Sequence, residues 1–401
     1  MSEEFQEKKQ YKRDLTDYGI KRPYETVGFP NLMHSRFLDH YINGDLDPEF
    51  RKQVLDMFKE ESFDASQRGY NLDFWFIRDV MGFIEDKKRL VFAGGNAAYS
   101  VLSYVLGITD SIDFRRGYRP EMIYGIKKDR RPYIPLIVPW DIEEDLLVKY
   151  LKTTYGEENV EYDGYAYTIS LHIEEKCCQL PLSLIKDRTL SFAERLLKKE
   201  CDESTIPNSC RDIICQEAEM AYTMTNTVQS CLNSVELKEV IADFAMLSHN
   251  VDENIINNFN RFLISTLDGT TEGLIHAVAL MKGMNVWDGT DESAASNGIY
   301  TRDDGYDCCL EFLDDKEKAF SIMENVRKGK KLNEKEINLL IEAGASDDYI
   351  KVCFKTGYIV CEGSILPYVQ ILLYLTASRI RNVKLYKTVL QEVMEQTQQL
   401  I

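Results

Sequence analysis

The chain has 401 residues, of which 44% are apolar and 28% charged, and its formal net charge is −18. This length and composition fit a folded protein of two or three structural units and exclude an intrinsically disordered chain. The negative charge excludes a surface that coats nucleic acid throughout, because each phosphate contact needs a local Lys or Arg. Any nucleic-acid site would have to be a local basic patch.

The cysteine pattern and the hydropathy of the chain indicate in which cellular compartment it is expected. The ten cysteines include two adjacent pairs and form no CxxC motif, so neither a zinc knuckle nor a disulfide framework is predicted. The first residues are polar and lack the apolar core of a signal peptide, and no apolar run reaches the ~20 residues of a membrane span. We therefore expect an intracellular, cytoplasmic protein without a membrane partner.

Residues 1–84 are predicted to form an N-terminal arm followed by helices. Prolines and a glycine interrupt residues 1 to 45, whereas residues 47–63 and 71–88 carry apolar side chains at helical spacing. Pro48 suits the first turn of the earlier helix. Two helices are expected before the first strand.

Residues 85–190 are predicted to form a small mixed α/β core. Residues 89–107 indicate a buried strand, a glycine pair and a helix, and residues 133–145 indicate a buried strand that ends in acids. Residues 159–175 alternate around a turn at Asp163-Gly164, which predicts a hairpin, and residues 178–185 suggest a further short strand. Four or five strands are expected.

Residues 191–401 are predicted to form a large helical region. The pairs Ser191/Glu194 and Asn333/Glu336 have the spacing of capping boxes that begin helices. Residues 287–307 are rich in glycine and acids and lack a period, so an exposed acidic loop is expected there. The predicted fold class is α+β, with a helical N-terminal arm, a small mixed β-sheet and a large α-helical C-terminal region.

The order strand, Gly-Gly, helix, acidic strand suits nucleotidyl transfer. Two glycines let the backbone approach a triphosphate, and the N-terminus of the following helix offers N–H groups to the anion. Two carboxylates at i, i+2 on one face of a strand can hold the Mg²⁺ ions that activate the attacking hydroxyl and stabilise the leaving pyrophosphate. A tight turn of any α/β domain accounts for the same glycines.

The string FAGGNAAYSVL, in this order of elements, resembles the polymerase-beta-like nucleotidyltransferase superfamily, and its GG-x-A opening is similar to that of the poly(A) polymerases of large DNA viruses. The resemblance covers roughly residues 88 to 187. It implies that Gly94 and Gly95 contact the nucleotide phosphates and that Asn96 stands where the family often has Ser or Thr. The implied activity is template-independent addition of nucleotides to an RNA 3′ end, with Mg²⁺ as cofactor.

Two places supply candidate metal ligands. In TDSIDF the acids Asp110 and Asp113 are three residues apart, and alignment on Asp113 puts Ser111 at the first ligand. In VPWDIEED, Asp141 and Glu143 have i, i+2 spacing. We assign catalysis to Asp141, Glu143 and Asp113, and Mg²⁺ binding to Asp141 and Glu143. Acids at these two positions would equally favour the N-terminus of the helix that follows.

The family's third carboxylate has no clear counterpart. The strand expected to carry it has Ser183 at that position and Asp187 at its end. This gap, together with Ser111, favours an alternative class: a non-catalytic structural or interaction protein, either a nucleotidyltransferase-like scaffold or an RNA- or partner-binding subunit. The glycine pair and the acids after the second strand favour the enzyme.

Residues 114–133 are the most basic part of the chain. Basic groups contact phosphates and aromatic rings stack on unpaired bases, so this segment is suited to single-stranded RNA. A solvated loop that balances an acidic protein is the alternative. The expected partners are a nucleoside triphosphate, single-stranded RNA, a protein or a second copy of the chain. The candidate nucleic-acid-binding residues are Arg115, Arg116, Arg119, Lys127, Lys128, Arg130 and Arg131.

Overall fold

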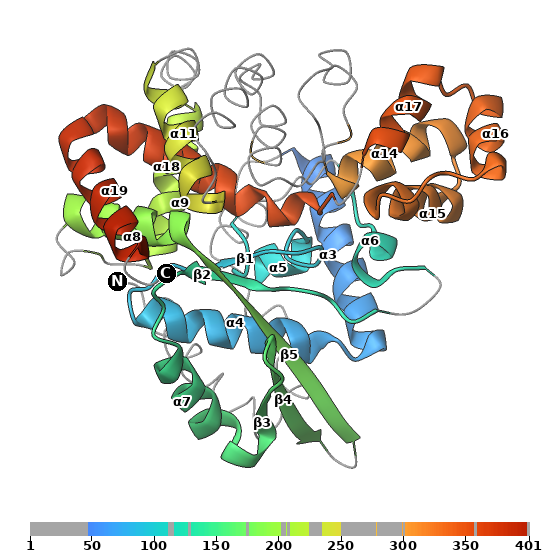
Figure 1. Cartoon of the computed structure of the whole chain (residues 1–401). Helices are drawn as coiled ribbons and strands as arrows, with labels where there is room; N and C mark the ends of the chain where they lie inside the picture. Colours follow the sequence, from blue (N-terminus) through green and yellow to red (C-terminus); the bar gives the residue numbers. More distant parts are fainter. Residues whose placement is uncertain are drawn as a thin grey trace. The chain divides into compact units, whose positions relative to one another are not determined.

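The computed structural model describes residues 47–110, 116–126, 130–173, 176–201, 206, 209–223, 235–249, 278, 299, 301–356 and 359–398. The described residues form two compact units, the first up to Lys186 without Ile126 and the second from Asp187 onward together with Ile126. The fold class is α+β, as predicted, with a five-stranded sheet in the first unit and a helical second unit (Figure 1). The division at residue 187 lies close to the predicted boundary at 190.

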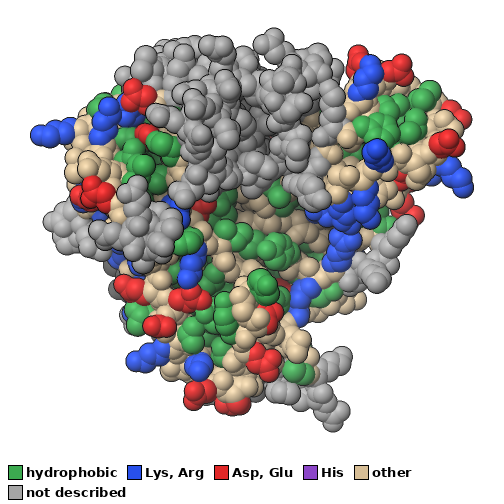
Figure 2. All heavy atoms as spheres, in the orientation of Figure 1, with side chains coloured by type: hydrophobic (Ala, Val, Ile, Leu, Met, Phe, Trp, Pro, Cys, Tyr) green, Lys and Arg blue, Asp and Glu red, His purple; other side chains and the backbone are tan. Residues whose placement is uncertain are grey.

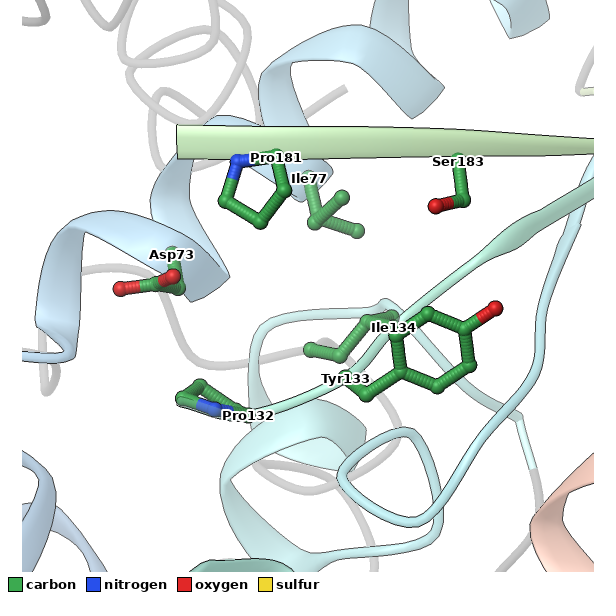
Figure 3. A pocket seen from close by; sticks show the side chains of 7 residues that line it. All are labelled: Asp73, Ile77, Pro132, Tyr133, Ile134, Pro181 and Ser183. Atoms are coloured by element: carbon green, nitrogen blue, oxygen red, sulfur yellow. The ribbon is translucent and has the colours of Figure 1, made fainter. Parts of the chain in front are cut away.

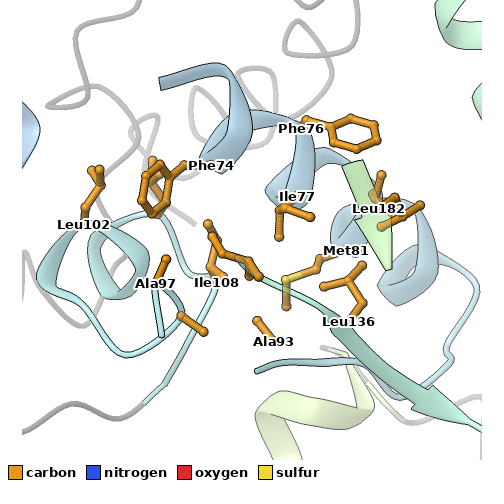
Figure 4. Close-up of a cluster of buried hydrophobic side chains, with 14 of the residues drawn as sticks. Phe74, Phe76, Ile77, Met81, Ala93, Ala97, Leu102, Ile108, Leu136 and Leu182 are labelled. Carbon is orange, nitrogen blue, oxygen red and sulfur yellow. The ribbon is translucent and has the colours of Figure 1, made fainter. Parts of the chain in front are cut away.

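Two helices precede the sheet, as the apolar spacing predicts: α3 (Pro48–Arg68) and α4 (Asn71–Asp86). The Asp47 side chain accepts a hydrogen bond from the Phe50 N–H and so caps α3, whereas Gly69, with φ 71°, ends it. The buried faces of both helices join the buried side chains of the sheet in one hydrophobic cluster. Figure 4 shows the part of this cluster that contains Phe74, Ile77 and Met81 of α4. The helices before residue 84 therefore belong to the same unit as the sheet.

The sheet has the strand order β1-β2-β5-β4-β3. Its strands are β1 (Phe92–Ala93), β2 (Leu136–Pro139), β3 (Val160–Tyr162), β4 (Ala166–Ile173) and β5 (Lys176–Asp187). The predicted hairpin is confirmed, because β3 and β4 pair antiparallel around Asp163 and Gly164. The shorter helical elements of this unit are α5 (Val101–Val105), α6 (Pro120–Tyr124), α7 (Glu144–Tyr155) and the 3₁₀ turn η4 (Glu157–Asn159).

The direction of β1 relative to β2 decides which ends of these strands are neighbours. The two strands are antiparallel, with Phe92 opposite Ile137 and Ala93 opposite Leu136. The end of β1 therefore lies beside the start of β2, and the start of β1 lies beside the end of β2.

The second unit consists of packed helices, with the most extensive contacts between α18 and α9 and between α14 and α15. Its helices are α8 (Arg188–Glu200), α9 (Cys210–Thr223), α11 (Val235–His249), α14 (Arg302–Leu313), α15 (Lys316–Arg327), α16 (Glu334–Glu342), α17 (Asp347–Lys355), α18 (Leu366–Arg381) and α19 (Val383–Gln398), with a 3₁₀ turn η7 (Glu362–Ser364). None of the helices in the described part of the chain is long and apolar enough to cross a bilayer.

The predicted acidic loop is wrong in its last part. Helix α14 begins at Arg302 with a capping box between Thr301 and Asp304, and Tyr306 is fully buried. Asp303 and Asp304, two of the acids that suggested a loop, are therefore first-turn residues of a helix, where they favour its N-terminus. Residues 287–298 and 300 lie outside the described residues.

Candidate functional site

The glycine pair makes a close contact with the chain that leads into β2. The Gly94 N–H donates a hydrogen bond to the Pro135 carbonyl at 2.9 Å. Gly95 has φ +89°, and a Cβ there would lie 2.4 Å from the Tyr133 carbonyl oxygen and 2.8 Å from Pro135 Cδ. Gly95 is therefore required by the approach of a neighbouring backbone segment.

Asn96 binds the backbone of the protein itself. Its side-chain amide donates to the carbonyls of Met122 at 2.9 Å and Ile123 at 2.8 Å. Both carbonyls belong to α6, so Asn96 fixes the position of that short helix. All three residues assigned to phosphate binding thus have a structural contact within the first unit.

The sequence pattern predicted that a helix begins directly after the glycines, but α5 begins several residues later. It begins at Val101, with Ser100 as its N-cap, because the Ser100 hydroxyl accepts the Ser103 N–H at 3.1 Å. The Val101 N–H donates to the Glu61 carboxylate at 3.1 Å. Glu61 reaches this position from α3, so a protein carboxylate contacts the helix terminus that was expected to meet a phosphate.

Glu61 is the residue of this region that the sequence reading missed. Its side chain is buried, with 1% of its surface exposed, and this burial raises its pKa to about 7 despite the hydrogen bonds it accepts. A signal was present, since Glu61 stands at a core position of the helical stripe that includes Val54, Phe58 and Ala65. An acid in an apolar stripe indicates a specific buried partner.

The acid pair does not lie on a strand. Strand β2 ends at Pro139, and Glu143 is the residue immediately before α7. Both acids approach Arg89, whose guanidinium lies 3.0 Å from Asp141 Oδ1 and 3.9 Å from Glu143 Oε1. The expectation that Asp141 and Glu143 share a strand face is wrong, because the chain turns into α7 directly after the proline.

The glycine turn and the acid pair lie at opposite ends of the β1–β2 ladder. Gly95 contacts Tyr133, at the start of β2, whereas Asp141 contacts Arg89, before the start of β1. Gly95 is six positions after Arg89, and an extended chain rises about 3.3 Å per residue, so the two places are at most about 20 Å apart along this segment. One metal-bound triphosphate needs both within a few ångströms of its oxygens, because Mg²⁺ binds oxygen at about 2.1 Å.

The residues around Asp141 do not fit a magnesium site. The Arg89 guanidinium already pairs with Asp141 and lies near Glu143, so it offsets one of the two negative charges, and its positive charge opposes a divalent cation at the same place. Across the described ranges, no group of three or more His, Cys, Asp or Glu side chains is arranged to hold a metal ion. Asp113 lies outside the described residues.

A small cavity lies at the glycine end of the sheet. Its volume is about 60 Å³, and Asp73, Tyr133, Pro181 and Ser183 are among the side chains that line it (Figure 3). This is room for a few water molecules and far below the ~300–1,000 Å³ of ordinary ligand pockets. Ser183, at the position of the expected third acid, faces this cavity, and Asp187 caps α8 by accepting the Thr189 N–H at 2.8 Å.

Arg131, one of the basic candidates, is a structural bridge. Its Nε lies 2.5 Å from Asp73 Oδ1, and its guanidinium donates to the Gln179 carbonyl and lies over the Tyr70 ring. Burial raises the pKa of Asp73 to about 7, and the charge of Arg131 opposes that rise. Arg131 thus joins α4 to β5.

The other basic candidates are only partly within the described residues. Arg119 Nε donates to the Arg116 carbonyl at 3.0 Å, both side chains are half-buried, and Arg130 is exposed. Arg115, Lys127 and Lys128 lie outside the described residues. Over α7 and β3 to β5, Figure 2 shows acidic and basic side chains interspersed. On the face shown, that part of the first unit is therefore not uniformly basic, as contact with a phosphate backbone would require.

Comparison with known proteins gives partial similarities only. No family model matches the chain. A stretch of 133 residues, 31% of this chain, is 32% identical to a DNA polymerase III PolC-type of Caldanaerobacter subterraneus subsp. tengcongensis. A stretch of 120 residues is 36% identical to a DNA polymerase III PolC-type of Mycoplasma genitalium. The chain covers 9% and 8% of these polymerases, less than a tenth of the length of the curated relatives that it matches.

Proposed function

We propose that this chain is a non-catalytic interaction protein in which a nucleotidyltransferase-like strand, glycine turn and helix serve as a scaffold. The observation that carries the proposal is that Gly95 and Asp141 lie beyond opposite ends of the paired strands β1 and β2. Nucleotidyl transfer needs the phosphates and the metal-binding carboxylates at one place. Here each of the two features has its own protein partners.

The contacts at the glycine turn support the same proposal. The Gly94 N–H and the Asn96 amide are hydrogen bonded to protein carbonyls, and the Val101 N–H is bonded to Glu61. A phosphate would have to displace a carboxylate that is already buried at the start of α5. That exchange exposes a buried acid or brings two anions together, and both are unfavourable.

A second function, addition of nucleotides to an RNA 3′ end with Mg²⁺, is favoured by one observation. The two relatives are each identical to this chain at about a third of the positions of a stretch of 120 to 133 residues, and both are named as DNA polymerases. In this candidate function Asp113 would supply a metal ligand near Gly94 and Gly95, and the Arg89-paired acids would have a structural role. The two candidate functions differ in the effect expected from substituting Asp113.

One primer-extension experiment separates the two candidate functions. The purified full-length chain, Asp113→Ala and the double variant Asp141→Ala/Glu143→Ala are each incubated with every NTP, Mg²⁺ or Mn²⁺ and a labelled RNA primer. A template-independent polymerase in the same buffer shows that the primer can be extended. We expect no extension by any form of the chain.

Each other outcome has a definite meaning. Extension that Asp113→Ala abolishes and the double variant retains would replace the scaffold by the second function. Extension lost in the double variant alone would show that Asp141 and Glu143 reach the nucleotide, against the separation seen along β1 and β2.

A further inference from the structure

Strand β3 is one edge of the sheet and offers backbone groups on its outer side. The strand order ends with β3, and among the described strands it pairs with β4 alone. The Asp163 N–H donates to the Ala166 carbonyl at 3.2 Å, which makes these two residues a hydrogen-bonded pair. Because such pairs alternate along an antiparallel ladder, the backbone N–H and C=O of Tyr162 point away from β4.

The end of β3 and the turn after it carry exposed tyrosines, and one of them is held in place. Residues 161–165 are all exposed, and Tyr165 and Tyr162 have exposed fractions of 91% and 57%. The Tyr162 ring stacks on Tyr167 with centroids 4.6 Å apart, and its hydroxyl donates to the Gly164 carbonyl at 3.0 Å. Tyr162 therefore presents one ring face in a fixed position, which lowers the entropy lost on binding.

Residues 157–165, here named the β3 edge, are strongly acidic. They contain Glu157, Glu158, Glu161 and Asp163 and no Lys or Arg. Hydrogen bonds from the backbone amides of Ala166 and Tyr165 hold the pKa of Asp163 below its ordinary value, so this carboxylate stays ionised at neutral pH. The nearest described cation partner is Lys152, 3.4 Å from Glu157.

We propose that the β3 edge docks an extended, basic segment of a partner protein. The segment adds a strand along the outer side of β3, its Lys or Arg side chains meet the carboxylates, and one of them lies over the Tyr162 ring. A second copy of this chain is disfavoured as the occupant, because edge pairing would bring two acidic sets together. Nucleic acid is disfavoured because these carboxylates repel its phosphates. The inference holds whether or not the core transfers nucleotides.

Binding of model peptides to the full chain tests this inference. The probe is a fluorescein-labelled peptide of alternating Lys and Val, followed by fluorescence anisotropy. The comparison peptides replace Lys by Glu, or replace Val by Pro so that the backbone cannot pair. We expect the Lys-Val peptide alone to bind, and we expect hydrogen exchange of the Tyr162 amide to slow when it does. Equal binding of the proline peptide would overturn strand addition, and equal binding of the acidic peptide would overturn recognition by charge.

Single substitutions locate the site. We expect Glu161→Lys to weaken binding about tenfold, equivalent to about 1.4 kcal/mol, and Tyr162→Ala to weaken it about two- to fivefold through the lost cation–π contact. The matched control is Glu342→Lys, an equal charge change at an exposed position of α16, which should bind like the parent. Three results would overturn the proposal. The first is an equal loss of affinity in the control variant, and the second is binding of a labelled single-stranded RNA at this edge. The third is self-association of the chain that Glu161→Lys abolishes.

Discussion

At the residue scale, Gly95 is the position where a single methyl group has the largest predictable effect. Its φ of +89° and a Cβ position 2.4 Å from a backbone oxygen combine conformational strain with overlap that cannot relax. We expect Gly95→Ala to lower the free energy of unfolding by about 2–4 kcal/mol in urea denaturation. The control is Gly164→Ala, which has φ +95° and nothing within 4 Å of the added Cβ, and should cost about 1–2 kcal/mol. Equal losses of unfolding free energy in the two variants would show that the close contact with Tyr133 adds nothing to the cost of the Gly95 substitution.

Glu61 makes stability depend on pH. Its pKa is raised from 4.5 to about 7 in the folded chain, so between these values the folded state binds more protons than the unfolded state. The free energy of unfolding therefore falls as pH rises from 4.5 through 7, by about 3 kcal/mol for this group. Glu61→Gln cannot ionise, yet its side-chain carbonyl can still accept the Val101 N–H.

The difference between the parent chain and Glu61→Gln isolates this effect from other titrating groups. We expect the two to have similar stability near pH 4.5 and the variant to be more stable at pH 8. Urea unfolding at several pH values measures the difference. Parallel stability profiles would contradict a buried, ionising Glu61.

At the element scale, α16 depends on its cap. The Asn333 side chain accepts the N–H groups of Lys335 and Glu336, and Glu336 in return accepts the Asn333 N–H. We expect Asn333→Ala to cost about 1 kcal/mol of unfolding free energy, because two terminal donors lose their acceptor. Asn338→Ala, at an exposed position inside the same helix, should be neutral or slightly stabilising. A loss in the Asn338 variant as large as in the Asn333 variant would show that the effect does not come from the cap.

Capping patterns also show how far local sequence specifies an element. Asn333 and Glu336 form the predicted capping box, whereas the equally spaced Ser191 and Glu194 lie buried inside α8. Asp187 caps that helix one turn earlier. A capping box sets the first residue of a helix where no other capping residue precedes it. At α8, Asp187 at the end of β5 caps the helix before the box is reached.

At the scale of the whole molecule, the first unit has a core of its own. The buried cluster and the apolar side chains packed on it all lie between residues 50 and 184. We expect a chain of residues 1–186 to fold and to unfold cooperatively, as measured by near-UV circular dichroism during urea denaturation. A chain that ends at residue 173 is the control, since it lacks β5, which lies between β2 and β4. We expect the shorter fragment not to fold. If the fragment of residues 1–186 did not fold either, its core would be incomplete.

The local elements of this protein are determined by its sequence. The helices before the sheet and the hairpin at Asp163-Gly164 follow from periodicity and turn chemistry over a few residues. The glycine pair and the spacing of Asp141 and Glu143 were equally visible, and together they suggested one site.

Only the tertiary structure decided that these features are apart. The antiparallel pairing of β1 with β2 places Gly95 beside Tyr133 and Asp141 beside Arg89, at opposite ends of one ladder. Sequence spacing does not specify which strand ends become neighbours, because that depends on strand direction across an intervening segment of about 40 residues. The pKa of Glu61 likewise depends on tertiary structure, because its side chain is buried only when α3 packs against α5.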